Sequence, residues 1–421
     1  MNIMVTTKQD TTVPAHQLLE QYTDQHCFFW SSPWHTLLAE GSYLCLPEVE
    51  QEELSSLSHR VTALLQQAYD SGQAQPVLVG AIPFDPELSP ARLVIPQQVQ
   101  WAAPRTVGEW TGSVRSILSD YELQEVPAAE LYKQGVEEAL VHLRQGDLEK
   151  VVLSRSLELT SSAPIPVAAL LHNLAAANTH GYTFAVHIPL EHERQLDSND
   201  RAEEYPVWIG ASPELLIRKE GRRFTANPLA GSAARSADPQ EDRRRAEALL
   251  VSAKDRHEHA VVIDAVVAAL RPYCGQLEVP NQPSLVQTET MWHLSTEISG
   301  VLDDPSITSL ELAAALHPTP AICGTPTEAA RDLIRQVEPF DRGMFTGMVG
   351  WCNKDGDGEW AVTIRCAEVC GPRLRLYAGA GIVAASTAEA ELAETSAKLR
   401  TMLRAMRIDE ASAQPAGRER E

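Results

Sequence analysis

Asp355-Gly-Asp-Gly358 separates two stretches that have the residue pattern of β-strands, and this segment decides the predicted fold class. Asp-Gly pairs form tight turns between antiparallel strands, because glycine tolerates a positive φ. A calcium loop is excluded, since Ile364-Arg365-Cys366 stands where such a loop needs a bidentate glutamate. The segment therefore predicts an antiparallel hairpin and an α+β fold, rather than a doubly wound parallel sheet.

Strands and helices interleave on both sides of this hairpin. Alternating or continuous apolar runs predict strands, and apolar residues three and four apart predict helices. In the strand that begins at Lys150, the period of two places Lys150, Val152 and Ser154 on one face. The predicted strands cover 76–83, 150–155, 360–366 and 373–378, with a strand, a tight turn and a second strand over 207–218; the predicted helices cover 54–68, 131–146, 243–271 in two parts, and 388–406.

The composition is that of a folded protein with a large core. Of the 421 residues, 44% are hydrophobic and 22% are charged, which excludes whole-chain disorder, collagen and coiled coil. No apolar run approaches the roughly 20 residues that span a bilayer. The N-terminus lacks a basic segment followed by an apolar one, so no secretory signal is visible. We therefore expect a cytoplasmic protein without a membrane partner.

The chain is strongly acidic, with 35 Lys and Arg against 57 Asp and Glu and a net charge of −22. Such a chain repels phosphate backbones, so we expect no nucleic-acid partner. An anionic substrate would need a local positive group, which could be Arg, Lys or a bound divalent metal. The seven cysteines are widely spread without a Cys-x-x-Cys pair, which favours reduced structural thiols over disulfides or zinc.

The residue pattern divides the chain into three parts. Residues 1–125 are weakly patterned and are predicted to form the N-terminal part of the fold. Residues 126–407 carry the motifs and are the predicted catalytic region. Within them, the polar residues 191–205 predict a surface insertion between two strands. Residues 408–421 are small, polar and charged, which predicts a disordered tail.

Lys150 and Glu214 each allow a structural and a catalytic interpretation. Lys150 begins an apolar strand, where an exposed edge lysine is the ordinary case. A lysine desolvated inside a pocket could instead act as a base. Glu214 follows a proline turn, so it is either a solvated turn carboxylate or a half-buried one. A half-buried carboxyl group has a raised pKa, which suits a general acid.

Three further carboxylates lie on predicted helices beside apolar faces. Glu258 is near the start of one helix, where the ordinary role of a carboxylate is to interact with the helix dipole. The flanking His257 and His259 point about 200° apart on a helix, so they cannot chelate one zinc ion. Glu391, Glu394 and Lys398 form one stripe of the C-terminal helix. That stripe predicts either surface salt bridges or a cation held at the edge of a cleft.

Gly379-Ala-Gly381 follows a predicted strand but is not a dinucleotide fingerprint. No helix opens directly after it, and too little chain remains for a βαβ unit. The glycines instead predict a backbone that closely approaches a carboxylate, with its N–H groups facing that group. Together with Arg365, these candidates form a set suited to acid–base chemistry on a carboxylated small molecule.

The motif-bearing segments stand in one order over about residues 130 to 405. In that order they resemble the chorismate-utilising (chorismate-binding) enzyme family, and they are most similar to its isochorismate synthases of the siderophore 2,3-dihydroxybenzoate type. The first third resembles the family only faintly. The matching segments are Lys150-Val-Val-Leu-Ser-Arg155, Gly210-Ala-Ser-Pro-Glu-Leu-Leu216, Pro228-Leu-Ala-Gly-Ser-Ala233, Lys254-Asp-Arg-His-Glu-His259, Leu316-His-Pro-Thr-Pro-Ala321, Glu338-Pro-Phe-Asp-Arg342, Gly347-Met-Val-Gly-Trp351, Val362-Thr-Ile-Arg-Cys-Ala367, Ala378-Gly-Ala-Gly-Ile-Val383 and Glu394-Thr-x-x-Lys398.

The resemblance implies a reversible conversion of chorismate to isochorismate, in which water adds at C2 of the ring and the C4 hydroxyl leaves. It implies Lys150 as the base that activates water and Glu214 as the acid that protonates the departing hydroxyl. Mg²⁺ would bind the ring carboxylate and suits oxygen ligands. The implied metal ligands are Glu258 and Glu394, with Glu391 in the water-mediated shell. Arg365 and the Gly379 N–H would hold the enolpyruvyl carboxylate. The other implied substrate contacts are Gly231, Ala321 and Lys398.

Two positions separate the branches of the family. Members that add ammonia typically lack a lysine at the position of Lys150, and salicylate-forming members typically carry Thr where this sequence has Ala321. The pair Lys150 and Ala321 therefore implies that isochorismate is released. Salicylate synthesis and menaquinone-pathway isochorismate synthesis are the alternatives. The implied fold is a single α+β unit of two large antiparallel sheets packed together with helices outside, and we expect a monomer.

Overall fold

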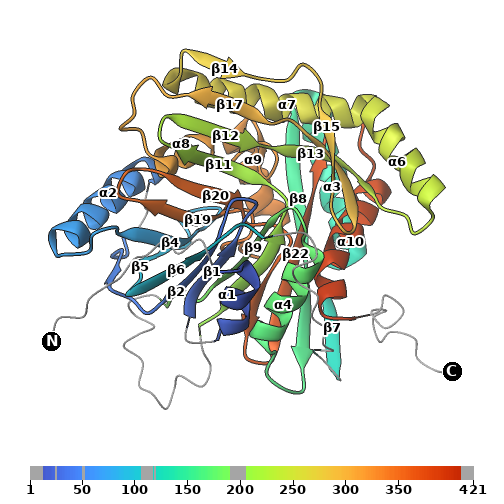
Figure 1. Ribbon diagram of the computed structural model, residues 1–421. Helices are drawn as coiled ribbons and strands as arrows, with labels where there is room; N and C mark the ends of the chain where they lie inside the picture. The colour runs from blue at the N-terminus through green and yellow to red at the C-terminus, as the bar shows by residue number, and fades with distance from the viewer. Residues whose placement is uncertain are drawn as a thin grey trace.

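The computed structural model describes residues 13–23, 26–49, 53–105, 117, 120–189 and 205–408. The predicted insertion lies outside these residues except for its last residue, and the predicted tail lies outside them except for its first. The described chain forms two large antiparallel sheets with helices on their outer faces (Figure 1), which confirms the predicted α+β fold. No helix in the described part is long and apolar enough to cross a membrane.

Sheet A contains the strand that begins at Lys150. Its longest pairing joins β8 (Lys150–Ser161) to β22 (Arg373–Ile382), with Val151 opposite Ile382 and Thr160 opposite Arg373. Over the described residues the order across the sheet is β18 (Gly324–Thr325), β8, β22, β21 (Cys366–Cys370), β10 (Val207–Ser212), β9 (Tyr182–Val186), β1 (His26–Ser31), β2 (Thr36–Glu40) and β6 (Gln98–Ala102), with β7 (Tyr121–Val126) also beside β8.

Sheet B contains the hairpin predicted from Asp355-Gly-Asp-Gly358. Cys352 pairs with Gly358 across that turn, and Gly356 has a φ of 78°, as a tight turn requires. The order across sheet B is β14 (Gln276–Glu278), β17 (Ile298–Val301), β12 (Arg223–Asn227), β11 (Leu215–Glu220), β20 (Gly358–Val362), β19 (Met348–Asn353), β4 (Val77–Ile82), β5 (Arg92–Ile95) and β3 (Leu44–Cys45); a small sheet C consists of β13 (Leu229–Ala234), β16 (Met291–Ser295) and β15 (Ser284–Gln287).

The inner faces of the two large sheets meet in an aromatic core, and helices cover the outer faces. Phe28, Trp30, Phe184 and Trp208 from sheet A pack against Val349 and other residues of sheet B. The predicted helices are confirmed to within a few residues. Over sheet B pack α2 (Leu54–Asp70), α7 (Ala253–Leu270) and α8 (Ser309–Leu316); over sheet A pack α1 (Ala15–Gln21), α4 (Val167–Ala177) and α10 (Ala388–Ala405); α3 (Ala129–Gln145) and α9 (Thr327–Val337) lie against β8, α6 (Pro239–Val251) lies against sheet C, and the short helix η1 (Arg271–Tyr273) follows α7.

The N-terminal third supplies strands to both large sheets. The blue strand β1 adjoins the green strand β9, and β4 adjoins β19 (Figure 1). The division of the chain at residue 126 stays a prediction, but strands from either side of it share the same two sheets.

The chain crosses between the large sheets at two neighbouring places. The predicted continuous strand over 360–366 is wrong: β20 ends at Val362 in sheet B, and β21 begins at Cys366 in sheet A. Between them Arg365 has a left-handed φ of 51°, which breaks the strand. The turn between β10 and β11 crosses in the same way and carries Glu214. The crossings are joined by hydrogen bonds from the Val362 N–H to the Glu214 carbonyl and from the Ala211 N–H to the Arg365 carbonyl. Glu214 and Arg365 therefore lie side by side at the ends of both sheets.

Candidate active site

A pocket opens where the two crossings meet β22, sheet C and the helices α7 and α10. We call it the central pocket. Its lining includes these predicted site residues: Glu214, Gly231, Glu258, Ala321, Arg365, Gly379, Glu394 and Lys398.

Lys150 is completely buried beside the central pocket. Its Nζ lies 3.0 Å from Oε1 of Glu258, which lines the pocket from the second turn of α7. Nζ has no hydrogen-bond partner among the described residues, so its contact with Glu258 is an ion pair. The interpretation of Lys150 as an exposed edge lysine is therefore wrong. The first residue of β8 places an amine, with hydrogen-bonding capacity to spare, against a pocket carboxylate.

Gly381 makes this arrangement possible. A Cβ atom on Gly381 would lie 2.1 Å from Oε1 of Glu258 and 2.8 Å from Cε of Lys150. The lysine and the carboxylate therefore meet directly against the bare backbone of β22. The predicted close approach of glycine backbone to a carboxylate is present at this position, although the carboxylate belongs to the protein.

Glu214 lies in the turn between β10 and β11 and is almost fully buried, at 3% exposure. Burial raises the pKa of Glu214 to about 7, although the Leu229 N–H and the charges of Lys150, Arg365 and Lys398 act to lower it. The Leu229 N–H is 3.4 Å from Oε1. The solvated-turn interpretation is therefore wrong. The group can carry a proton near neutral pH, as a general acid must.

Arg365 is held by a histidine that the sequence analysis did not single out. His293, on β16, lines the central pocket, and burial lowers its pKa well below the usual range. The neutral ring can accept the hydrogen bond from Nη2 of Arg365 at 3.2 Å. The Nε of Arg365 has no hydrogen-bond partner among the described residues. Because β16 is far from Arg365 in the chain, no local pattern in the sequence marks this pairing.

The carboxylates of α10 are paired with lysines. Glu394 contacts Nζ of Lys398 at 2.6 Å, and the same Nζ donates a hydrogen bond to the Gly379 carbonyl at 2.8 Å. Glu391 is completely buried and contacts Nζ of Lys254 at 2.7 Å. Glu391 is not among the residues that line the central pocket. The stripe of α10 therefore reaches the pocket through Glu394 and Lys398.

Comparison with known proteins identifies the family of the chain. The sequence model of a family described as chorismate binding enzyme matches residues 95–407. The chain belongs to the family of chorismate-binding enzymes.

Relatives of this chorismate-binding enzyme match nearly its whole length. It is 54% identical to the isochorismate synthase DhbC of Bacillus subtilis (strain 168), over 95% of this chain and 98% of the relative. It is 42% identical to the vibriobactin-specific isochorismate synthase of Vibrio cholerae, over 95% of this chain and 96% of the relative. The crystal structure of DhbC from Bacillus anthracis has a TM-score of 0.85 at 49% identity, covering 94% of this chain and 100% of that one.

The carboxylates predicted to bind a metal fit Mg²⁺ in their chemistry. In the described part of this chorismate-binding enzyme, no three His, Cys, Asp or Glu side chains are grouped to hold a metal ion. Two carboxylates, Glu258 and Glu394, nevertheless line one pocket. Mg²⁺ commonly binds through one or two carboxylates and keeps several waters, so the oxygen donors of this pair are of the kind that the ion prefers. Glu391 does not line the pocket and contacts Lys254, and its role in the outer shell stays a prediction.

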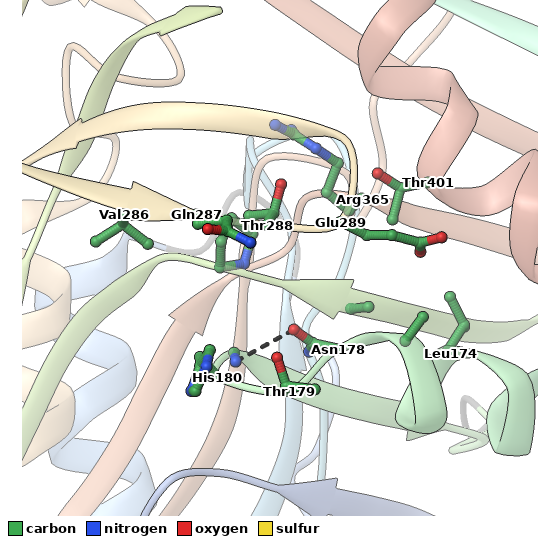
Figure 2. A pocket seen from close by; sticks show the side chains of 14 residues that line it. Leu174, Asn178, Thr179, His180, Val286, Gln287, Thr288, Glu289, Arg365 and Thr401 are labelled. Atoms are coloured by element: carbon green, nitrogen blue, oxygen red, sulfur yellow. Dashed lines mark hydrogen bonds between the residues drawn. The ribbon is translucent and has the colours of Figure 1, made fainter. Parts of the chain in front are cut away.

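A second cavity borders the central pocket at Pro213 and Arg365. Figure 2 shows His180 and Thr179 on its lower side, with the guanidinium of Arg365 turned away from them. This cavity lacks the lysine–carboxylate pairs and the buried acid of the central pocket. The central pocket is therefore the candidate active site of this chorismate-binding enzyme, and Arg365 lies at its border.

Proposed function

We propose that the protein is an isochorismate synthase, an isomerase that converts chorismate reversibly to isochorismate for siderophore 2,3-dihydroxybenzoate synthesis. The observation that carries the proposal is one pocket bordered by a buried lysine–glutamate pair, a carboxyl group with a pKa of about 7, and a buried arginine. The names of the relatives from Bacillus subtilis and Vibrio cholerae support the same activity.

Lys150 and Glu214 would carry out the two proton transfers of the proposed reaction. Lys150 would take a proton from the water that attacks C2 only as the neutral amine, so it must first give up the proton of its ion pair with Glu258, which lies 3.0 Å from Nζ. Glu214 would give its proton to the C4 hydroxyl as that group leaves, because its raised pKa keeps part of it protonated near pH 7. Burial of both groups excludes bulk water, which strengthens their electrostatic effect on the reacting atoms.

Positive groups that line the pocket would hold the carboxylate of the enolpyruvyl arm. Arg365 has an unused Nε donor and is kept in orientation by His293. Lys398 reaches the same pocket from α10. These local cations let a dianion bind although the chain carries a net charge of −22.

A Mg²⁺ ion is part of the proposal. Glu258 and Glu394 would hold it, and when bound it would neutralise the ring carboxylate and withdraw electrons from the ring. A cytoplasmic location and a monomeric state also stay proposals. The location is supported by free thiols at Cys45, Cys274, Cys323, Cys352 and Cys366.

The decisive experiment is product analysis of the purified protein with chorismate and Mg²⁺. We expect isochorismate as the released product, identified by chromatography against a standard. Salicylate with pyruvate would move the protein to the lyase branch of the family. Anthranilate or aminodeoxychorismate, formed with an ammonia source, would move it to the aminating branch.

Removal of the metal is expected to abolish turnover and to leave the fold intact. Chelation by EDTA should stop isochorismate formation, and added Mg²⁺ should restore it.

In calorimetric titration of Mg²⁺ without substrate, Glu394→Gln should weaken binding by at least about tenfold. The exposed Glu137 of α3 is the control position, and Glu137→Gln should bind Mg²⁺ as the wild type does. Full activity in EDTA, or unchanged Mg²⁺ affinity of Glu394→Gln, would refute this part of the proposal.

Gly381→Ala is expected to lower kcat by about 100-fold, because the new methyl group must push the Glu258 carboxylate away from Lys150. Gly275→Ala is the matched control, since the nearest atom to its Cβ lies at 3.5 Å. Steady-state kinetics and thermal melting of both variants check the prediction. Wild-type kcat in Gly381→Ala would mean that contact between Lys150 and Glu258 is not needed.

A further inference from the structure

The edge of β8 that faces away from β22 lacks a complete strand partner. β18 pairs with Lys150 and Val151, and β7 pairs from Ser156 onward. Residues 152–155 lie in the gap between these two partners. On this edge the Val152 N–H donates to the Cys323 carbonyl at 2.7 Å, so a loop begins to fill the gap. The gap lies only two residues from Lys150.

A buried ion pair fills the rest of this gap. Glu338 at the end of α9 and Arg342 in the following loop contact each other at 2.5 and 2.8 Å, and both side chains are 2% exposed. Oε1 of Glu338 accepts the hydrogen bond of the Ser154 N–H at 2.7 Å. Nη2 of Arg342 donates to the Val152 carbonyl at 2.8 Å. One acceptor and one donor therefore stand where a neighbouring strand would place them.

The same guanidinium reaches two other segments of the pocket wall. Its Nη1 donates to the Ile322 carbonyl at 2.8 Å and to Oγ1 of Thr346 at 3.2 Å. Its Cζ lies 5.8 Å from the ring centre of Phe345. Val152, Ile322, Phe345 and Thr346 all line the central pocket. One side chain thus connects three segments of the pocket wall, including the one that carries Ala321.

We propose that Glu338 and Arg342 are positioning residues, which hold the Lys150 strand and the Ala321 loop at their places around the substrate. The inference rests on the proposed function for the identity of the reaction. Neither residue is among those that line the pocket, so both act through the residues that they hold. An apolar pair could replace the two charges, but it could not satisfy the backbone groups of Val152, Ser154 and Ile322.

Arg342→Lys is the sharpest variant, because it keeps the charge but loses the planar fork that reaches several carbonyls at once. We expect kcat to fall by about 100-fold, as for a displacement of about 1 Å at a catalytic group. KM for chorismate should stay within about threefold, because Arg365 and Lys398 hold the substrate from other segments. Glu338→Gln keeps an oxygen acceptor for the Ser154 N–H, so its kcat should fall less than that of Arg342→Lys.

Lys219→Met is the matched control for a loss of stability. Lys219 is a buried lysine paired with Asp357 at 2.9 Å, at the end of β11 beside the hairpin turn. Its loss should lower the melting temperature and leave kcat unchanged. If kcat of Lys219→Met fell together with its melting temperature, or if Arg342→Lys kept wild-type kcat, the positioning role would be refuted.

Hydrogen–deuterium exchange separates this inference from the proposed function. In Arg342→Lys the amides of peptides covering residues 150–156 should exchange at least about tenfold faster than in the wild type, whereas Lys219→Met should leave them unchanged. If the wild type makes no isochorismate, the proposed function fails and exchange alone decides the inference. Faster exchange would support it, and unchanged exchange would overturn it.

Discussion

Lys150→Ala is expected to lower kcat for isochorismate formation by about 1,000-fold, because the variant lacks the base that activates the attacking water. The substrate should still bind, since Arg365 and Lys398 line the pocket independently of β8. KM should therefore change far less than kcat. Steady-state kinetics with chromatographic product analysis measure both quantities.

Stability must be separated from catalysis in this variant. Removal of Lys150 leaves Glu258, whose side chain is 9% exposed, without its ion-pair partner. Breaking a buried pair on one side costs about 3–5 kcal/mol, so the melting temperature should fall. Lys219→Ala breaks a similar pair with Asp357 at 2.9 Å, away from the pocket, and should keep wild-type kcat. If folded Lys150→Ala retained more than about a tenth of wild-type kcat, Lys150 would not be the base.

Glu214→Gln is expected to lower kcat by about 100-fold or more, because an amide can donate a hydrogen bond but cannot give a proton to the leaving hydroxyl. The shape of the side chain is kept, so the acceptor for the Leu229 N–H remains. KM should change little. Kinetics at saturating chorismate measure the effect, and wild-type kcat in this variant would exclude Glu214 as the acid.

The same variant tests the pKa of Glu214 through stability. The folded-state pKa, about 7, lies above the ordinary carboxyl value of 4.5 because of burial. Between these two values the folded state holds a proton that the unfolded state has lost, so the contribution of Glu214 to stability falls as pH rises. The loss amounts to about 3 kcal/mol and is complete above pH 7.

Glu214→Gln lacks this titration. The free energy of unfolding of the variant, minus that of the wild type, should therefore rise from pH 4.5 to pH 7 and then stay level. Urea unfolding across this range measures the difference. A difference that does not vary with pH would mean that the carboxyl group ionises at its ordinary value.

Local patterns in the sequence predicted the elements, but not every partner of those elements. The hairpin at Asp355-Gly-Asp-Gly358 is confirmed, because turn chemistry is set by adjacent residues. The break between β20 and β21 was missed, since period-two alternation does not tell to which sheet a strand belongs. Glu214 and Arg365 meet only because both chain crossings occur at the same ends of the sheets.

Long-range pairing also decided the surroundings of the candidate residues. His293 reaches Arg365 from sheet C, and Lys254 reaches Glu391 across two helices. Neither partner shares a short-range pattern with the residue that it contacts. The Glu338–Arg342 pair lies within one motif, yet its role depends on the open edge of β8, which no spacing within that motif reveals.

The sequence by itself determined the α+β class, the helices and strands that carry most of the motifs, the family resemblance and the set of side chains available for acid–base chemistry. These follow from propensity, period and residue type, which act over a few positions of the chain. Only the tertiary structure decided which side chains are desolvated, which charges pair, and which strand edges side chains complete. Burial and electrostatic pairing are set by distances in space, and these arise when segments far apart in the chain pack together.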